Sequence, residues 1–116
     1  MDLKNNCLDN LFRSFKDLDI RVGTIVHSEH FKEARNSSYK LNIDFGELGI
    51  LKSSAQITKN YSIESLIGVQ VIAVVNFKKK QIANFYSECL VLGVVDGDSV
   101  VLLKPFSKVK NGLRIA

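Results

Sequence analysis

The sequence contains no tryptophan, one proline, two cysteines and two histidines among its 116 residues. Cys7 lies near the start and Cys89 inside an apolar run, so the chain has neither a disulfide framework nor a CxxC metal motif, and both thiols are expected to be reduced. His27 and His30, with Glu29 between them, have no cysteine nearby, and neighbouring side chains on a strand point apart. The sequence therefore predicts no metal and no cofactor.

Long hydrophobic runs and enzyme motifs are also missing. No apolar segment approaches the roughly 20 residues of a membrane helix, and residues 1–6 lack the apolar core of a secretory signal. The chain has no phosphate-binding P-loop, no GxGxxG and no GxSxG motif, and neither histidine has a neighbouring serine or cysteine in the arrangement of an activated nucleophile. We therefore expect a cytoplasmic protein that is not an enzyme.

Composition indicates one folded domain with a basic bias. The chain is 46% hydrophobic and 24% charged, which fits a single globular domain spanning residues 1–116. Its 16 basic and 12 acidic residues give a net charge of +4, which permits a polyanionic partner without requiring one. Positive charge is concentrated in Lys78, Lys79 and Lys80 and in the segment after Asp98, which has no acidic residue.

The N-terminal extension, residues 1–18, has the pattern of an amphipathic helix. Four large apolar residues follow the spacing i, i+3, i+4 and i+7, which places them on one face: Leu8, Leu11, Phe12 and Phe15. A stripe this apolar has to be buried. Two interpretations remain open, in which the helix either caps its own domain or packs against a second copy of the protein.

The remainder has the alternating pattern of short strands separated by turns. The predicted strands are 20–26, 39–45, 50–54, 69–77 and 89–95, and the segment 99–104 either continues the fifth strand or forms a hairpin with it. Gly23 indicates a bulge or bend in the first strand, and residues 27–38 are expected to form an irregular loop. Ser62 is predicted to cap a helical turn over residues 63–67 that ends at Gly68.

This arrangement favours an all-β fold, a five-stranded oligonucleotide-binding Greek-key barrel with short helices. The position of the small helix between the third and fourth strands supports that choice. A sandwich or an open α+β sheet fits less well because the strands are few and the internal helix is short. The tail, residues 105–116, is apolar enough to pack against the barrel.

The polar segment between the fourth and fifth strands is expected to be a surface loop with chemistry of its own. Lys78 to Lys80 suit successive phosphates as point charges, or form an ordinary solvated face. Phe85 or Tyr86 would stack on an unpaired base, although core packing is the more common role of such a Phe. Ser87 and Glu88 would hydrogen-bond to bases, or Glu88 would pair with a lysine.

Several blocks in order resemble the tRNA-binding domain family over nearly the whole chain. They are residues 19–26, 33–35, 40–46, 53–57 and 71–76, followed by Ser87-Glu88. Within that family the chain is most similar to the stand-alone bacterial CsaA proteins, which are described as export-related chaperones. These are relatives of the C-terminal domain of bacterial methionyl-tRNA synthetase and of the endothelial-monocyte-activating polypeptide module.

The resemblance implies a homodimer that binds tRNA by its structure, with unfolded or precursor polypeptides as a second class of partner. The RNA-binding residues implied by position are Lys52, Ser53, Ser54, Gln56, Asn76, Lys79, Lys80, Ser87 and Glu88, and the charge pattern adds Lys78. Both chain ends would lie at the dimer interface, through Leu8, Leu11, Phe12, Phe15, Val109, Leu113 and Ile115.

The chain departs from the family in the polar segment. Lys78 and Lys79 stand where relatives commonly have prolines, and Asn84 stands in a glycine position, where asparagine tolerates a left-handed backbone. The leading hypothesis is a non-enzymatic tRNA-binding homodimer. The alternatives are a polypeptide-binding chaperone on the same scaffold and, more remotely, a structural subunit of a synthetase complex.

Overall fold

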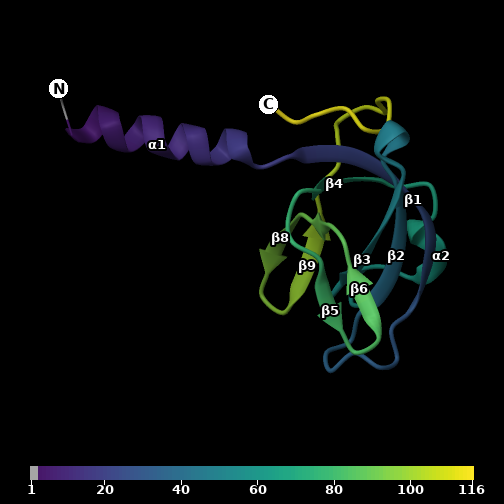
Figure 1. Cartoon of the computed structure of the whole chain (residues 1–116). Helices are drawn as coiled ribbons and strands as arrows, with labels where there is room; N and C mark the ends of the chain where they lie inside the picture. Colours follow the sequence, from purple (N-terminus) through teal and green to yellow (C-terminus); the bar gives the residue numbers. More distant parts are fainter. Residues whose placement is uncertain (1–2) are drawn as a thin grey trace.

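A five-stranded antiparallel barrel forms the body of the protein in the computed structural model, which describes residues 3–116, with side chains from residue 8 onward (Figure 1). The side chain of Cys7 lies outside the described residues. The strand order is β3-β2-β1-β4-β7, and the predicted all-β barrel is confirmed. The five strands are β1 (Ile20–His30), β2 (Tyr39–Asp44), β3 (Ile50–Ala55), β4 (Gln70–Val74) and β7 (Leu90–Val91).

Strand β2 shows how the sequence pattern becomes a core. Its residues alternate between buried and half-buried, and Leu41 and Ile43 are completely buried. Gly23 of β1 lies opposite this layer, where a Cβ atom would come within 2.7 Å of side-chain atoms of Ile43 and Phe45. Glycine is therefore needed for close approach. The predicted irregularity of β1 is displaced from Gly23, because the register shift against β2 falls between Ile25 and His27.

The helices differ in how they attach to the barrel. Helix α1 (Leu3–Asp17) projects away from it, and the molecule measures 53 × 31 × 26 Å along its principal axes (Figure 1). The short helices η1 (Gly46–Leu48) and α2 (Ile63–Leu66) lie on the barrel, and Ser62 caps α2 through a reciprocal pair of hydrogen bonds with Ser65. No helix within residues 3–116 is long and apolar enough to cross a membrane.

Several predicted boundaries were wrong, among them that of the fourth strand, which was expected over residues 69–77 and covers Gln70–Val74. Strand β1 runs to His30, into the expected loop, because it pairs with β2 along its whole second half. The polar segment, which was expected to be a surface loop, contains a hairpin of β5 (Lys80–Ile82) and β6 (Phe85–Ser87). The predicted fifth strand divides into β7 and β8 (Gly93–Asp96), and β8 forms a separate hairpin with β9 (Ser99–Leu102).

The turn of the β5–β6 hairpin also differs from expectation. Ala83, with φ of 54°, holds the left-handed conformation that the sequence assigned to Asn84. A left-handed residue with a Cβ costs about 1–2 kcal/mol. The turn is therefore strained.

The C-terminal tail packs beside β1, as predicted. The Gly112 N–H donates to the Val22 carbonyl at 2.7 Å, and the Ile115 N–H donates to the Ile20 carbonyl at 2.8 Å. In the other direction, the Val22 N–H donates to the Leu113 carbonyl at 3.0 Å. These bonds extend the sheet beyond β1 and carry the chain end to the base of α1.

Candidate nucleic-acid interface

Ser87 and Glu88 join the two edges of the barrel. The Glu88 N–H donates to the Lys52 carbonyl at 2.8 Å, and its Oε1 accepts from the Lys52 N–H at 3.0 Å. Two residues further along β3, the Ser87 Oγ accepts from the Ser54 N–H at 3.3 Å. These bonds thus replace part of a strand ladder between β3 and the segment that begins at the end of β6. The junction formed by Lys52, Ser54, Ser87 and Glu88 is called the seam below.

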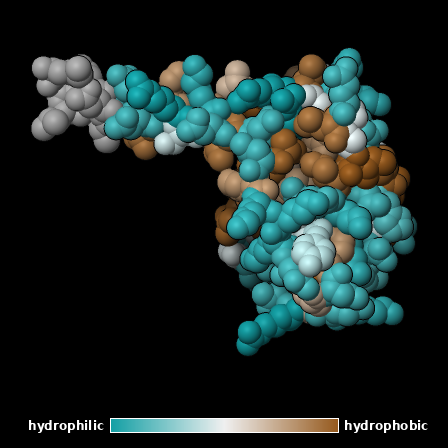
Figure 2. All heavy atoms as spheres, viewed as in Figure 1, coloured by the Kyte–Doolittle hydropathy of each residue, from teal (hydrophilic) through white to brown (hydrophobic). Residues whose placement is uncertain are grey.

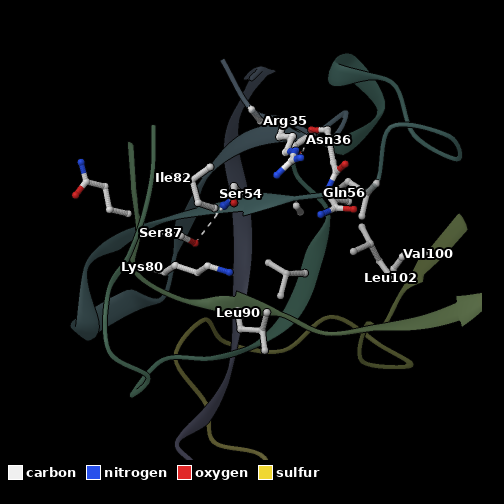
Figure 3. Close-up of a pocket in the computed structure, with 16 residues that line it drawn as sticks. Arg35, Asn36, Ser54, Gln56, Lys80, Ile82, Ser87, Leu90, Val100 and Leu102 are labelled. Carbon is white, nitrogen blue, oxygen red and sulfur yellow. Dashed lines mark hydrogen bonds between the residues drawn. The ribbon is translucent and has the colours of Figure 1, made fainter. Parts of the chain in front are cut away.

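A groove of about 870 Å³ opens beside this seam (Figure 3). One wall comes from β3 and the loop after β1, and the other comes from the β5–β6 hairpin. Its floor is apolar and includes Ile57, Leu90 and Leu102. Of the sequence-predicted RNA-binding residues, four line this groove: Ser54, Gln56, Lys80 and Ser87.

The other predicted RNA-binding residues lie elsewhere. Lys78 and Glu88 line a smaller hollow of about 150 Å³ that shares Lys80 and Ser87 with the groove. Lys52 is exposed on the seam. Ser53 is completely buried and its hydroxyl donates to the Cys89 carbonyl at 3.0 Å, so it belongs to the core and not to an accessible surface.

The groove carries positive charge. Arg35 and Lys80 line it, and no carboxylate is found among the lining residues that the structure describes. Lys79 lies 3.4 Å from Glu88 Oε2, so this lysine is partly neutralised. Arg35 and Lys80 form no ion pair with any described residue. The pair of Lys79 and Glu88 corresponds to the sequence-based alternative in which Glu88 pairs with a lysine.

Sequence reasoning missed the loop after β1. Arg35 and Asn36 line the groove. Residues 33–35 are one of the blocks that resemble the family, but no local pattern indicates that this loop lies over β3. A cluster of two aromatic rings and a lysine that holds this loop was also not predicted from the sequence. The Phe31 and Phe85 rings meet edge to face at 5.3 Å, and Lys40 Nζ lies 4.9 Å and 5.5 Å from their centroids. This clasp, defined as Phe31, Lys40 and Phe85, connects the two walls.

Cys89 offers no reactive thiol. It is buried behind the seam, and burial raises the pKa of its thiol to about 12. The thiol is therefore protonated at neutral pH and is a poor nucleophile. Within the part of the chain that the structure describes, no three His, Cys, Asp or Glu side chains form a group that would hold a metal ion.

Asn76 lies apart from the groove, at the base of α1. Its Nδ2 donates to the Asp17 carbonyl at 2.8 Å, and its Oδ1 accepts from the Asp19 N–H at 2.9 Å. Arg114 reaches the same junction and donates to the Lys16 carbonyl at 2.9 Å. These bonds link α1 to the end of β4 and to the tail, so Asn76 orients the helix.

Replacing Asn76 with alanine should lower the free energy of unfolding by about 1–2 kcal/mol, because two hydrogen bonds at the junction are lost. Urea denaturation followed by circular dichroism measures the change. Asn84→Ala is the matched control, since Asn84 is exposed in the hairpin turn, and it should change stability by less than about 0.5 kcal/mol. Equal effects of the two substitutions would contradict the junction role.

Helix α1 and the tail form a second apolar surface. The predicted interface residues Leu8, Leu11, Phe12 and Phe15 are 55%, 63%, 61% and 41% exposed, because no part of the described chain covers this face of the helix. Ile115 of the tail joins Phe12 and Phe15 around a notch of about 440 Å³. Leu113 is half exposed, and the Val109 N–H donates a hydrogen bond to Oε1 of Gln70. Figure 2 shows hydrophobic side chains along the helix and on the barrel beside it.

A family model described as "Putative tRNA binding domain" matches residues 20–114. The chain belongs to this tRNA-binding domain family. A curated relative, the methionine–tRNA ligase of Methanococcoides burtonii, is 34% identical over 102 residues, which are 87% of this chain and 15% of the ligase. The tRNA-binding domain therefore spans about 15% of the length of such ligases.

Two solved structures match this tRNA-binding domain over 90% of its length. The chaperone CsaA from Bacillus anthracis is 55% identical, with a TM-score of 0.87, and is covered over 96% of its own chain. The CsaA chaperone protein from Picrophilus torridus is 52% identical, with a TM-score of 0.86 and 97% coverage. The similarity to CsaA predicted from the sequence is confirmed.

Proposed function

We propose that the protein is a non-enzymatic, cytoplasmic homodimer that binds tRNA by recognising structured RNA through the groove beside the seam. The observation that carries this proposal is the convergence of Ser54, Gln56, Lys80 and Ser87, from two distant segments, in one groove that has cations and no carboxylate among its described lining residues. Membership of the tRNA-binding domain family supports it.

Within this proposal the polar residues divide into two groups. Lys80 on the groove, with exposed Lys52 and Lys78 nearby, positions phosphates as point charges. Ser87 and Glu88 shape the wall through their bonds to β3, and Glu88 holds Lys79 beside it. Base contacts by Ser87 and Glu88, which the sequence predicted, stay a prediction.

Titration of labelled tRNA at several salt concentrations tests the proposal. Three or more phosphate contacts should make the logarithm of the binding constant fall with the logarithm of the salt concentration, at a slope of about −2 to −3. Lys80→Gln should make this slope shallower by about 0.7 to 0.9, the contribution of one phosphate contact. Lys59→Gln, which removes a lysine paired with Asp98, serves as the control. A flat salt response, or no binding near physiological salt, would overturn the RNA-binding function.

A chaperone that binds precursor polypeptides for export is the second candidate. It is favoured by exposed apolar side chains on and after the β8–β9 hairpin, where Val95 is 78% exposed and Phe106 fully exposed. It is favoured also by the similarity to the two CsaA chaperones. Binding of an unfolded polypeptide that barely depends on salt, and that Phe106→Ser weakens, would support this candidate.

The homodimer is proposed from the exposed face of α1. An isolated helix of 15 residues is marginally stable in water, so most of its stability has to come from packing of its apolar face. The notch formed by Phe12, Phe15 and Ile115 offers a complementary surface on each copy. A symmetric pair would bury both stripes, as C₂ interfaces commonly do.

A further inference from the structure

The groove combines cationic side chains on both walls with an apolar floor, which phosphate binding alone does not require. Its floor is apolar and includes Leu90, which is 48% exposed. Arg35 and Lys80 come from opposite walls, and Figure 3 shows both side chains directed into the cavity, with Ser54 between them. The cationic groups thus stand beside an apolar surface that is partly open to solvent.

A double helix does not match this shape. An RNA duplex is convex, presents its phosphates on the outside and keeps its bases stacked inside, so its bases would not reach a concave apolar floor. An unpaired base has a free apolar face and free polar edges. The amide groups of Asn36, Gln56 and Gln81 line the groove and provide donors and acceptors for such edges.

We infer that the groove holds an unpaired stretch of RNA, in which Arg35 and Lys80 bind phosphates from opposite walls and a base rests on the floor at Leu90. This inference rests on the proposed tRNA-binding function and specifies which part of the RNA the site takes. Arg35 becomes an RNA-binding residue, although it lies outside the set derived from the sequence. The volume of about 870 Å³ lies within the usual range of ligand clefts.

The walls are held in place before RNA binds. The clasp of Phe31, Lys40 and Phe85 connects the loop that carries Arg35 to the hairpin that carries Lys80. Lys40 also lies 3.9 Å from Glu33 of the same loop. A preformed groove binds more tightly, since less conformational entropy is lost on association.

Competition against labelled tRNA tests the inference with three probes: a single-stranded oligouridylate of about eight nucleotides, the same strand without bases, and a blunt RNA duplex. The single strand should displace tRNA, and the duplex should do so much less well. The strand without bases should bind at least about fivefold more weakly than the intact strand. Leu90→Ser should remove most of that difference without changing binding of the strand that lacks bases.

The cationic pair is tested by Arg35→Gln and Lys80→Gln. Each should weaken binding of tRNA and of the single strand about tenfold and reduce the salt slope by about 0.7. Lys108→Gln is the matched control, since Lys108 is exposed on the tail and lines none of the three cavities described above. It should leave both affinities nearly unchanged.

The outcomes separate this inference from the function on which it rests. If tRNA binds with a steep salt slope but only the duplex competes, or if Arg35→Gln behaves like the Lys108 control, the inference is wrong and tRNA binding stands. If wild-type protein binds no tRNA, both fail. If an unfolded polypeptide binds at Leu90 and the single strand does not displace it, the groove belongs to polypeptides and the inference is overturned.

Discussion

Replacing Phe12 with aspartate should convert the proposed homodimer into a monomer. Phe12 is 61% exposed on the apolar face of α1 and borders the notch that Ile115 closes. Burial of a phenylalanine contributes about 1.5–3 kcal/mol, and a symmetric interface contains two copies, so the loss is about 3 kcal/mol or more. The dissociation constant of the dimer should therefore rise by more than about 100-fold.

Light scattering or sedimentation measures this change at a fixed protein concentration. Asn10→Asp is the matched control, because Asn10 lies on the opposite face of α1 and the substitution introduces the same charge. The control should remain a dimer. An unchanged mass for Phe12→Asp would remove the helix from the interface, and the exposed stripe would then need a different partner.

Removal of the Glu88 carboxylate should open the barrel seam. In Glu88→Ala, the Lys52 N–H loses its acceptor at 3.0 Å and Lys79 loses its ion pair. The Glu88 side chain is only 22% exposed, so water replaces these bonds incompletely. A hydrogen bond to a charged group contributes about 1.5–3 kcal/mol, and we expect the free energy of unfolding to fall by about 2 kcal/mol.

Glu88→Gln separates the hydrogen bond from the charge. The amide oxygen still accepts from the Lys52 N–H, so urea denaturation should show a loss of less than about 1 kcal/mol. Freed from its ion pair, Lys79 should then raise the affinity for tRNA. Glu47→Gln, at an exposed position of η1, controls for the change in net charge. A stable Glu88→Gln variant with weakened tRNA binding would instead support the direct base contact predicted from the sequence.

The two predictions address different parts of the proposed function. Phe12 lies on the arm that α1 extends from the barrel, whereas Glu88 lies at the seam beside the groove. Because Asn76 fixes α1 to the end of β4, the orientation of the arm is determined by the barrel itself.

Local patterns in the sequence were sufficient for the elements whose periodicity is strong. The alternation of residues 39–45 predicted β2, and the spacing of Leu8, Leu11, Phe12 and Phe15 predicted α1, because side-chain direction follows directly from strand and helix geometry. The position of the capped turn at Ser62 and the succession of short strands also indicated the barrel. The order of the sequence blocks identified the family.

Tertiary structure alone decided which polar residues distant in the sequence contact one another. Asn76 meets residues 57 and 59 positions away, and Glu88 meets Lys52 across 36 positions, so no local pattern records either partner. The division of the predicted fifth strand and the placement of Arg35 over the groove depend in the same way on segments that meet only in the folded chain. The sequence by itself determined the elements and the family, whereas long-range contacts, which periodicity does not encode, determined the site.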